Sequence, residues 1–103
     1  MSRACVESPC VESRDGRIRV SGSLCFDTVP DLREAGVRLI RAGAGQVDLD
    51  GVSDVDSSAL ALLMEWRRTA ADEGRELRFQ AVPAAIREIA ALSEVDRVLD
   101  LEA

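Results

Sequence analysis

Short stretches of the chain alternate polar and apolar residues with a period of two, which is typical of strands that bury one side. Four such strands are predicted, at 10–12, 17–21, 46–50 and 77–82. Asp15-Gly16 is a strong turn signal, so the first two strands are expected to form a hairpin. Gly22-Ser23-Leu24 is expected to break the second strand. Gly51 is expected to end the third strand, with a loop over 52–55 after it.

Longer stretches between the strands carry apolar residues at helical spacing. The predicted helices are one at about 29–42, one that begins at Asp56-Ser57-Ser58 and continues to about Glu73, and one that starts at Pro83. Each of the three residues at the start of the second helix is a good N-cap. The residues of that helix predicted to face the core are Leu60, Leu63, Met64 and Ala71.

Strands and helices alternate along most of the chain, with Val98-Leu99 as a further edge strand or a packed tail. Right-handed crossovers place helices that follow parallel strands mostly on one face of a sheet. The sequence therefore predicts a single α/β domain with a mixed four- to five-stranded sheet and helices mainly on one face. Residues 1–9 are predicted to be a flexible N-terminus and residues 10–103 the domain.

Composition and charge exclude several classes of protein. The 103 residues are 31% charged and 47% hydrophobic, as expected of a soluble globular domain. Thirteen basic and 19 acidic residues give a net charge of -6. This charge argues against generic nucleic-acid binding and against binding to an anionic membrane surface. No apolar run approaches a membrane span, and the N-terminus has no signal-peptide pattern. We therefore expect a cytoplasmic protein.

No set of residues predicts catalysis. Histidine is absent, which excludes histidine-based triads and most zinc sites. Gly43 and Gly45 precede a strand rather than a helix, so they do not match a dinucleotide-binding loop. A Mg²⁺ site could be composed of Asp48, Asp50, Asp54 and Asp56, but capping and loop roles explain these residues better. No enzyme activity, cofactor or metal is predicted.

Cysteine occurs at three positions, Cys5, Cys10 and Cys25. An odd number in a small acidic chain is not typical of a disulfide scaffold. We expect free thiols in a reducing compartment.

The start of the second helix has two interpretations. Asp56, Ser57 and Ser58 can simply cap the helix, which is worth about 1 kcal/mol. Alternatively, a phosphate on a serine there would gain hydrogen bonds from the free N–H groups, opposed in part by Asp54 and Asp56. From the residues alone, capping is favoured.

The apolar surface of the same helix is wider than contact with a sheet requires. Leu62 and Trp66, four residues apart, lie on a neighbouring face. Either Phe26 or the N-terminal hairpin covers this face, or it is a surface for a partner. Both interpretations stay open on the residues alone.

Several segments occur in an order that resembles a known family. They are Gly22-Ser23-Leu24, Val47–Val52, Val55–Leu63, Gly74 before Leu77-Arg78-Phe79, and Val82-Pro83 with Ile86 and Leu92. Over about residues 18–99, this ordered set resembles the STAS domain, named for sulfate transporters and anti-sigma factor antagonists. The resemblance implies a STAS-like α/β fold, no catalysis and an interacting second helix.

The chain shares features with two subgroups of this family. Anti-sigma factor antagonists carry a phosphorylatable serine directly after the aspartate, the position of Ser57, but Ala59 here replaces their usual glycine. The small cytoplasmic STAS subunits of phospholipid-trafficking Mla ABC transporters tend to show Val-Asp-(Thr/Ser) followed by Leu-Ala-Leu-Leu. Val55-Asp56-Ser57 and Leu60–Leu63 resemble this second pattern more closely. An apolar helix with Trp66 also favours a stable subunit over a reversible switch.

The resemblance implies that the partner is the ATPase subunit of such a transporter, or alternatively an anti-sigma factor kinase that phosphorylates Ser57. It implies neither nucleic-acid binding nor direct membrane insertion. The protein would be cytoplasmic and peripheral to the inner membrane through the transporter complex. The expected partner-binding residues are Asp56, Ser57, Ser58, Ala61, Leu62, Glu65 and Trp66.

Overall fold

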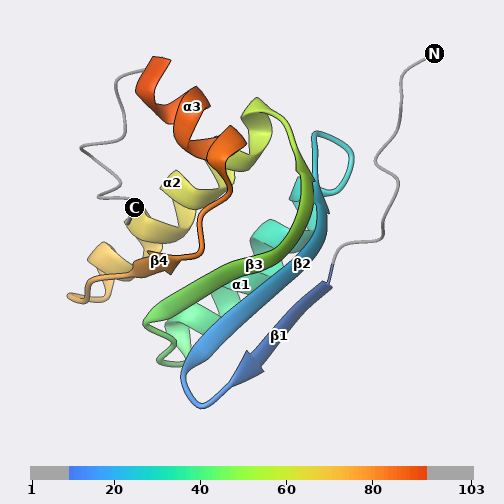
Figure 1. Cartoon of the computed structure of the whole chain (residues 1–103). Helices are drawn as coiled ribbons and strands as arrows, with labels where there is room; N and C mark the ends of the chain where they lie inside the picture. Colours follow the sequence, from blue (N-terminus) through green and yellow to red (C-terminus); the bar gives the residue numbers. More distant parts are fainter. Residues whose placement is uncertain (1–9, 93–103) are drawn as a thin grey trace.

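Four strands form one mixed sheet in the order β1-β2-β3-β4 (Figure 1). The structure is a computed structural model that describes residues 10–92. The strands are β1 (Cys10–Arg14), β2 (Arg17–Leu24), β3 (Gln46–Val55) and β4 (Arg78–Gln80). β1 is antiparallel to β2, whereas β2, β3 and β4 are parallel to one another. The predicted strand or tail at Val98-Leu99 and the predicted flexible segment 1–9 lie outside the described residues.

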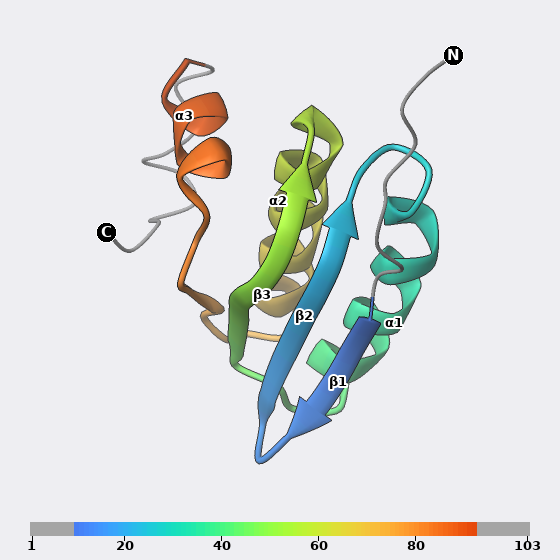
Figure 2. The same ribbon diagram turned by 45° about the vertical axis from the view of Figure 1, so that its right-hand side comes forward.

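Three helices accompany the sheet, α1 (Val29–Arg41), α2 (Ser57–Asp72) and α3 (Ala84–Leu92). α1 and α2 lie side by side against one face of the sheet, and α3 packs beside α2 (Figure 2). The predicted mixed sheet with helices on one face is confirmed. Among the described helices, none combines the length and the apolar character needed to cross a membrane.

The N-terminal hairpin forms as predicted. Asp15 and Gly16, the two residues between the strands, both have positive φ, at 53° and 77°. Positive φ at both central positions matches the twist of a two-residue hairpin, and Asp-Gly adopts it readily. The turn aligns Arg14 with Arg17 and sets the register of the whole β1–β2 pair.

β2 and β3 are longer than predicted. β2 does not break at Gly22 but continues to Leu24, and β3 continues through 52–55 to Val55. β2 and β3 hydrogen-bond to each other along this stretch, so each continues past residues that disfavour a strand on their own. Gly51 lets the backbones approach, because a Cβ there would lie 2.8 Å from the Cβ of Ser21.

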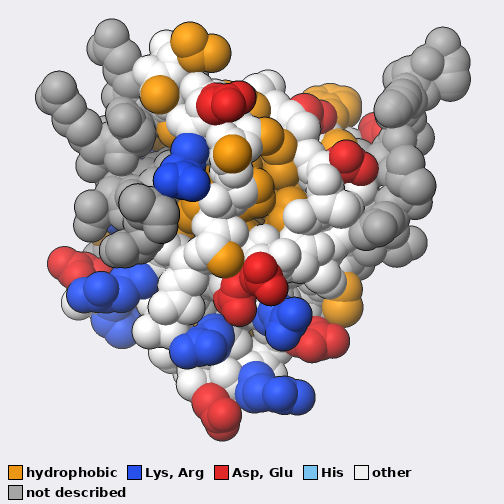
Figure 3. Space-filling view, viewed as in Figure 1, with side chains coloured by type: hydrophobic (Ala, Val, Ile, Leu, Met, Phe, Trp, Pro, Cys, Tyr) orange, Lys and Arg blue, Asp and Glu red, His pale blue; other side chains and the backbone are white. Residues whose placement is uncertain are grey.

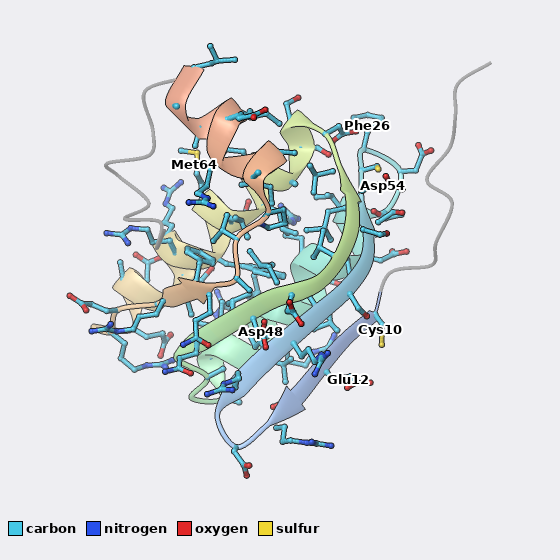
Figure 4. All side chains as sticks on the ribbon, in the orientation of Figure 1. Cys10, Glu12, Phe26, Asp48, Asp54 and Met64 are labelled. Carbon is cyan, nitrogen blue, oxygen red and sulfur yellow. The ribbon has the colours of Figure 1, made fainter. Side chains whose placement is uncertain are left out.

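The core lies between the sheet and the helices. Alternate strand residues such as Ile18, Val20, Val47 and Leu49 point into it, and the residues between them leave the opposite face polar. Glu12 and Asp48 are on that open face (Figure 4). Within residues 10–92, β4 pairs only with Gln46–Asp48 of β3. Figure 3 shows apolar side chains at the surface between α3 and the remainder of β3.

The side of α2 that faces the core differs from the prediction. Leu60 and Leu63 are buried as expected, but Met64 is 38% exposed and Ala71 is also exposed. α1 packs along α2 and covers a further part of its surface. The buried face is therefore rotated toward α1, and the prediction for Met64 and Ala71 is wrong.

The prediction of free cysteines is also wrong in part. Cys25 is disulfide-bonded, whereas Cys10 is free and exposed. Cys25 lies at a partly exposed position directly after β2. An odd number of cysteines leaves room for one bond, so the number does not establish a reducing compartment. Cys5 lies outside the described residues.

Candidate functional site

The N-terminus of α2 begins where β3 ends, and Asp56 caps it. Asp56 has an extended backbone, with φ -134° and ψ -171°, and its Oδ1 accepts a hydrogen bond from the Ser58 backbone N–H at 2.9 Å. The Ser58 hydroxyl donates to the same oxygen. The predicted capping is therefore confirmed for Asp56, which uses Ser58 rather than Ser57 as its partner.

The same carboxylate joins the helix to the loop between β2 and α1. Asp56 Oδ2 accepts a hydrogen bond from the Phe26 backbone N–H at 3.0 Å, and the Asp56 N–H donates to the carbonyl of Leu24 at 3.2 Å. Burial alone would raise the pKa of Asp56. The hydrogen bonds from the Ser58 hydroxyl and from the N–H groups of Phe26 and Ser58 outweigh it, so the pKa of Asp56 is lowered.

Asp56→Ala should lower the free energy of unfolding by about 1–2 kcal/mol, because the cap and the link to the loop are both lost. Because the folded-state pKa is lowered, the carboxylate contributes its stability above the usual pKa of 3.8, and this is lost as the pH falls through the folded-state value. Urea denaturation at pH 7 and pH 3 measures both effects. Asp56→Asn is the control, since it keeps a capping oxygen without a charge. Equal pH dependence in this variant and the unaltered protein would contradict the assignment.

Ser57 differs from Ser58 in what surrounds its hydroxyl. Ser57 is exposed, and its hydroxyl makes no hydrogen bond with any residue in the described range 10–92. It stands at the first position of α2, where backbone N–H groups are free and the helix dipole is positive. An accessible hydroxyl at this position can contact a partner or accept a phosphoryl group. The sequence contains no histidine that could serve as its base.

Several exposed residues of α2 share one side of the helix. We define the α2 outer face as Ser57, Ala61, Met64, Glu65 and Arg68. Their spacing of three and four residues is that of a single helical face. Glu65 pairs with Arg33 of α1 at 3.4 Å, and Figure 4 shows Met64 on α2 beside α3. Four of the predicted contact residues therefore lie close together at the surface or near it: Asp56, Ser57, Ala61 and Glu65.

Leu62 and Trp66 do not belong to this surface. They are 1% and 0% exposed, so the prediction that they are exposed partner contacts is wrong. The Trp66 indole packs over Gly36 of α1, where a Cβ would overlap the ring, and its Nε1–H donates to the carbonyl of Arg33 at 3.2 Å. α1, rather than Phe26 or the hairpin, covers this side of α2.

Phe26 is not among the contact residues predicted from the sequence, although it is 77% exposed beside the N-cap. It lies between a strand and a helix, where period and spacing carry no information about burial. The signal available was Gly36. A glycine inside an otherwise helical pattern indicates close packing, and here it accommodates the ring of Trp66.

The open face of the sheet also carries charged residues. Within residues 10–92, no three acidic or cysteine side chains lie close enough together to hold a metal ion. A depression of about 540 Å³ on the open face of the sheet is lined by Glu12, Arg14, Asp15, Arg17, Arg19, Ser21 and Asp48. Its charges are mixed, and it lies on the opposite side of the sheet from α2.

Solved structures support the same architecture. A chain of the Acinetobacter MlaFEDB complex in its ATP-bound Vtrans2 conformation superposes with a TM-score of 0.74 at 25% identity, covering 85% of this chain and 95% of that one. An anti-sigma factor antagonist from Mycobacterium paratuberculosis also gives 0.74, at 24% identity, over 98% and 89% of the two chains. The phosphorylated Bacillus cell fate determinant SpoIIAA gives 0.64 at 17% identity, over 86% of each chain. The last two likenesses concern the fold.

No curated protein matches the chain significantly. The family model described as "Mlab, STAS domain" matches residues 11–101, which include every described strand and helix in whole or nearly so. Since this match extends over most of the 103 residues and agrees with the fold, the chain belongs to the STAS domain family.

Proposed function

We propose that this protein is a non-enzymatic subunit that binds the ATPase of a phospholipid-trafficking ABC transporter through the N-terminus and outer face of α2. The observation that carries the proposal is the Ser57 hydroxyl, exposed and without a hydrogen bond to a described residue at the start of that helix. The family match and the likeness to a chain of the MlaFEDB complex support this partner. Trp66 no longer supports it, because the side chain is buried.

The α2 outer face suits a protein contact. Ala61 and Ser57 are small, so a partner can approach the helix closely, and Met64 offers a flexible apolar side chain. Glu65 with Arg33 adds polar groups at the side toward α1. Binding would stabilise the ATPase, or its working conformation, by added interface. The protein would then lie at the cytoplasmic side of the inner membrane through its complex.

Ser57→Asp should weaken binding to the ATPase about tenfold or more. The added carboxylate stands near Asp54 and Asp56 and must lose its water in the contact. The fold should not suffer, because a negative charge is favourable at a helix N-terminus. Co-expression with the ATPase of the same transporter, followed by co-purification and calorimetric titration, measures the effect.

Ser13→Asp is a matched control, since it adds the same charge at an exposed position of β1. It should bind like the unaltered protein. Equal binding by Ser57→Asp and Ser13→Asp would exclude the α2 N-terminus as the contact. Failure of the unaltered protein to bind the ATPase would reject the proposed function.

A second candidate is an anti-sigma factor antagonist that is switched by phosphorylation of Ser57. The same exposed hydroxyl favours it, since a kinase can reach this oxygen, whereas the Ser58 hydroxyl is bonded to Asp56. Incubation with an anti-sigma factor kinase and ATP, read by mass spectrometry, distinguishes the two functions. Phosphate on Ser57 that is lost in Ser57→Ala and kept in Ser58→Ala would support the switch.

A further inference from the structure

Phe26 is the exposed aromatic residue of the described chain. The sequence contains three aromatic residues, and the other two, Trp66 and Phe79, are buried in the core. Phe26 is 77% exposed and lies directly beside the cap of α2, through its hydrogen bond to Asp56. A large aromatic side chain in water at the edge of a candidate interface is a typical anchor for a partner.

The loop that carries Phe26 is held by hydrogen bonds on both sides. The Thr28 hydroxyl accepts from the Cys25 N–H at 3.0 Å and donates to the Ser23 carbonyl at 2.8 Å. The N–H groups of Thr28 and Val29 both donate to the Cys25 carbonyl at 2.9 Å. On the other side, Asp56 holds the N–H of Phe26 itself. The backbone is therefore already ordered, and a partner would immobilise little more than one side chain.

The surroundings of Phe26 are acidic. The segments 20–32 and 50–66, which meet at this end of the molecule, contain no arginine or lysine. Asp27 and Asp54 are exposed there, and Figure 4 shows Asp54 at the same end of the sheet as Phe26. An apolar anchor with acidic neighbours complements an apolar pocket bordered by lysine or arginine.

We propose that Phe26 inserts into an apolar pocket with a basic border on the protein that binds the α2 N-terminus. This inference rests on the proposed function and extends it, because it adds a second contact and states the chemistry of the partner surface. Asp56 would link the two contacts, since its carboxylate holds both the first turn of α2 and the backbone of Phe26.

Phe26→Ser should weaken binding to the ATPase about tenfold or more, with unchanged thermal stability because the side chain contributes little to the core. Phe26→Leu should retain most of the affinity, since it keeps an apolar side chain. Leu92→Ser is the matched control, because Leu92 is 87% exposed on α3. Calorimetric titration of each purified variant with the purified ATPase measures the affinities.

The acidic surroundings are tested separately. Asp27→Asn should slow association and make the association rate less dependent on salt between roughly 0.1 and 0.5 M, the range over which screening becomes strong. Asp72→Asn, at the other end of α2, should change neither quantity. Unaltered affinity in Phe26→Ser would overturn the inference and leave the proposed function standing. No binding by the unaltered protein would reject both.

Discussion

Trp66→Ala is expected to lower the free energy of unfolding by about 3–5 kcal/mol. The indole is fully buried between α1 and α2, and its removal leaves a cavity and eliminates the hydrogen bond from its Nε1–H to the carbonyl of Arg33. Domains of this size are usually stable by only about 5–15 kcal/mol, so the variant should lose a large part of its stability. Urea denaturation followed by circular dichroism measures the change.

Met64→Ala is the appropriate comparison, since it also shortens a large apolar side chain of α2. Met64 is partly exposed, and its replacement should cost clearly less than that of Trp66. If the two variants were equally stable, Trp66 would not occupy the space between the helices. Such a result would indicate that Trp66 is exposed and available for contact with a partner.

Gly36→Ala is expected to destabilise the protein by about 1–3 kcal/mol or more. On helix propensity alone, this change should stabilise α1 by about 1 kcal/mol, so the expected sign is reversed. The reason is that the new Cβ would overlap the rigid Trp66 ring, and α1 must move away from α2 to make room. Thermal and urea denaturation of the single variant give the sign directly.

A double-mutant cycle tests whether the two residues act on each other. In the Trp66→Ala background the indole is gone, so Gly36→Ala should become neutral or stabilising. The combined loss of stability should therefore be smaller than the sum of the two single losses. Additive losses would contradict direct packing of the ring on Gly36.

Local sequence patterns were sufficient to predict most of the helices and strands. Asp15-Gly16 predicted the hairpin, and Pro30 followed by apolar residues predicted a helix within one residue of the observed α1. Asp56 predicted the start of α2, because a capping aspartate interacts only with the next few residues. These features depend on residues close in sequence, so an isolated segment carries the information.

Strand lengths were not predictable in the same way. Gly22 and Gly51 looked like the ends of strands, yet both lie within the parallel β2–β3 pair. A glycine weakens a strand considered alone, but between two strands it permits the close approach that the pairing requires. The outcome depended on a partner strand about thirty residues away.

The candidate site was predicted in part for a related reason. The exposed positions of Ser57, Ala61 and Glu65 agree with their residue types and spacing. Leu62 and Trp66 are as apolar as an interface anchor, and α2 could present them to a partner or to another helix with equal ease. One of the two open interpretations had Phe26 or the hairpin covering them, but Phe26 lies in water.

The order of strands and helices, the mixed sheet, the lack of histidine-based chemistry and the capped start of α2 all follow from the amino-acid sequence, because short-range preferences and composition govern them. Only the tertiary structure decided which apolar residues of α2 are exposed to solvent. Burial depends on the sum of contacts from distant segments, and the missing side chain of Gly36 allowed α1 to enclose Trp66 while leaving Phe26 outside.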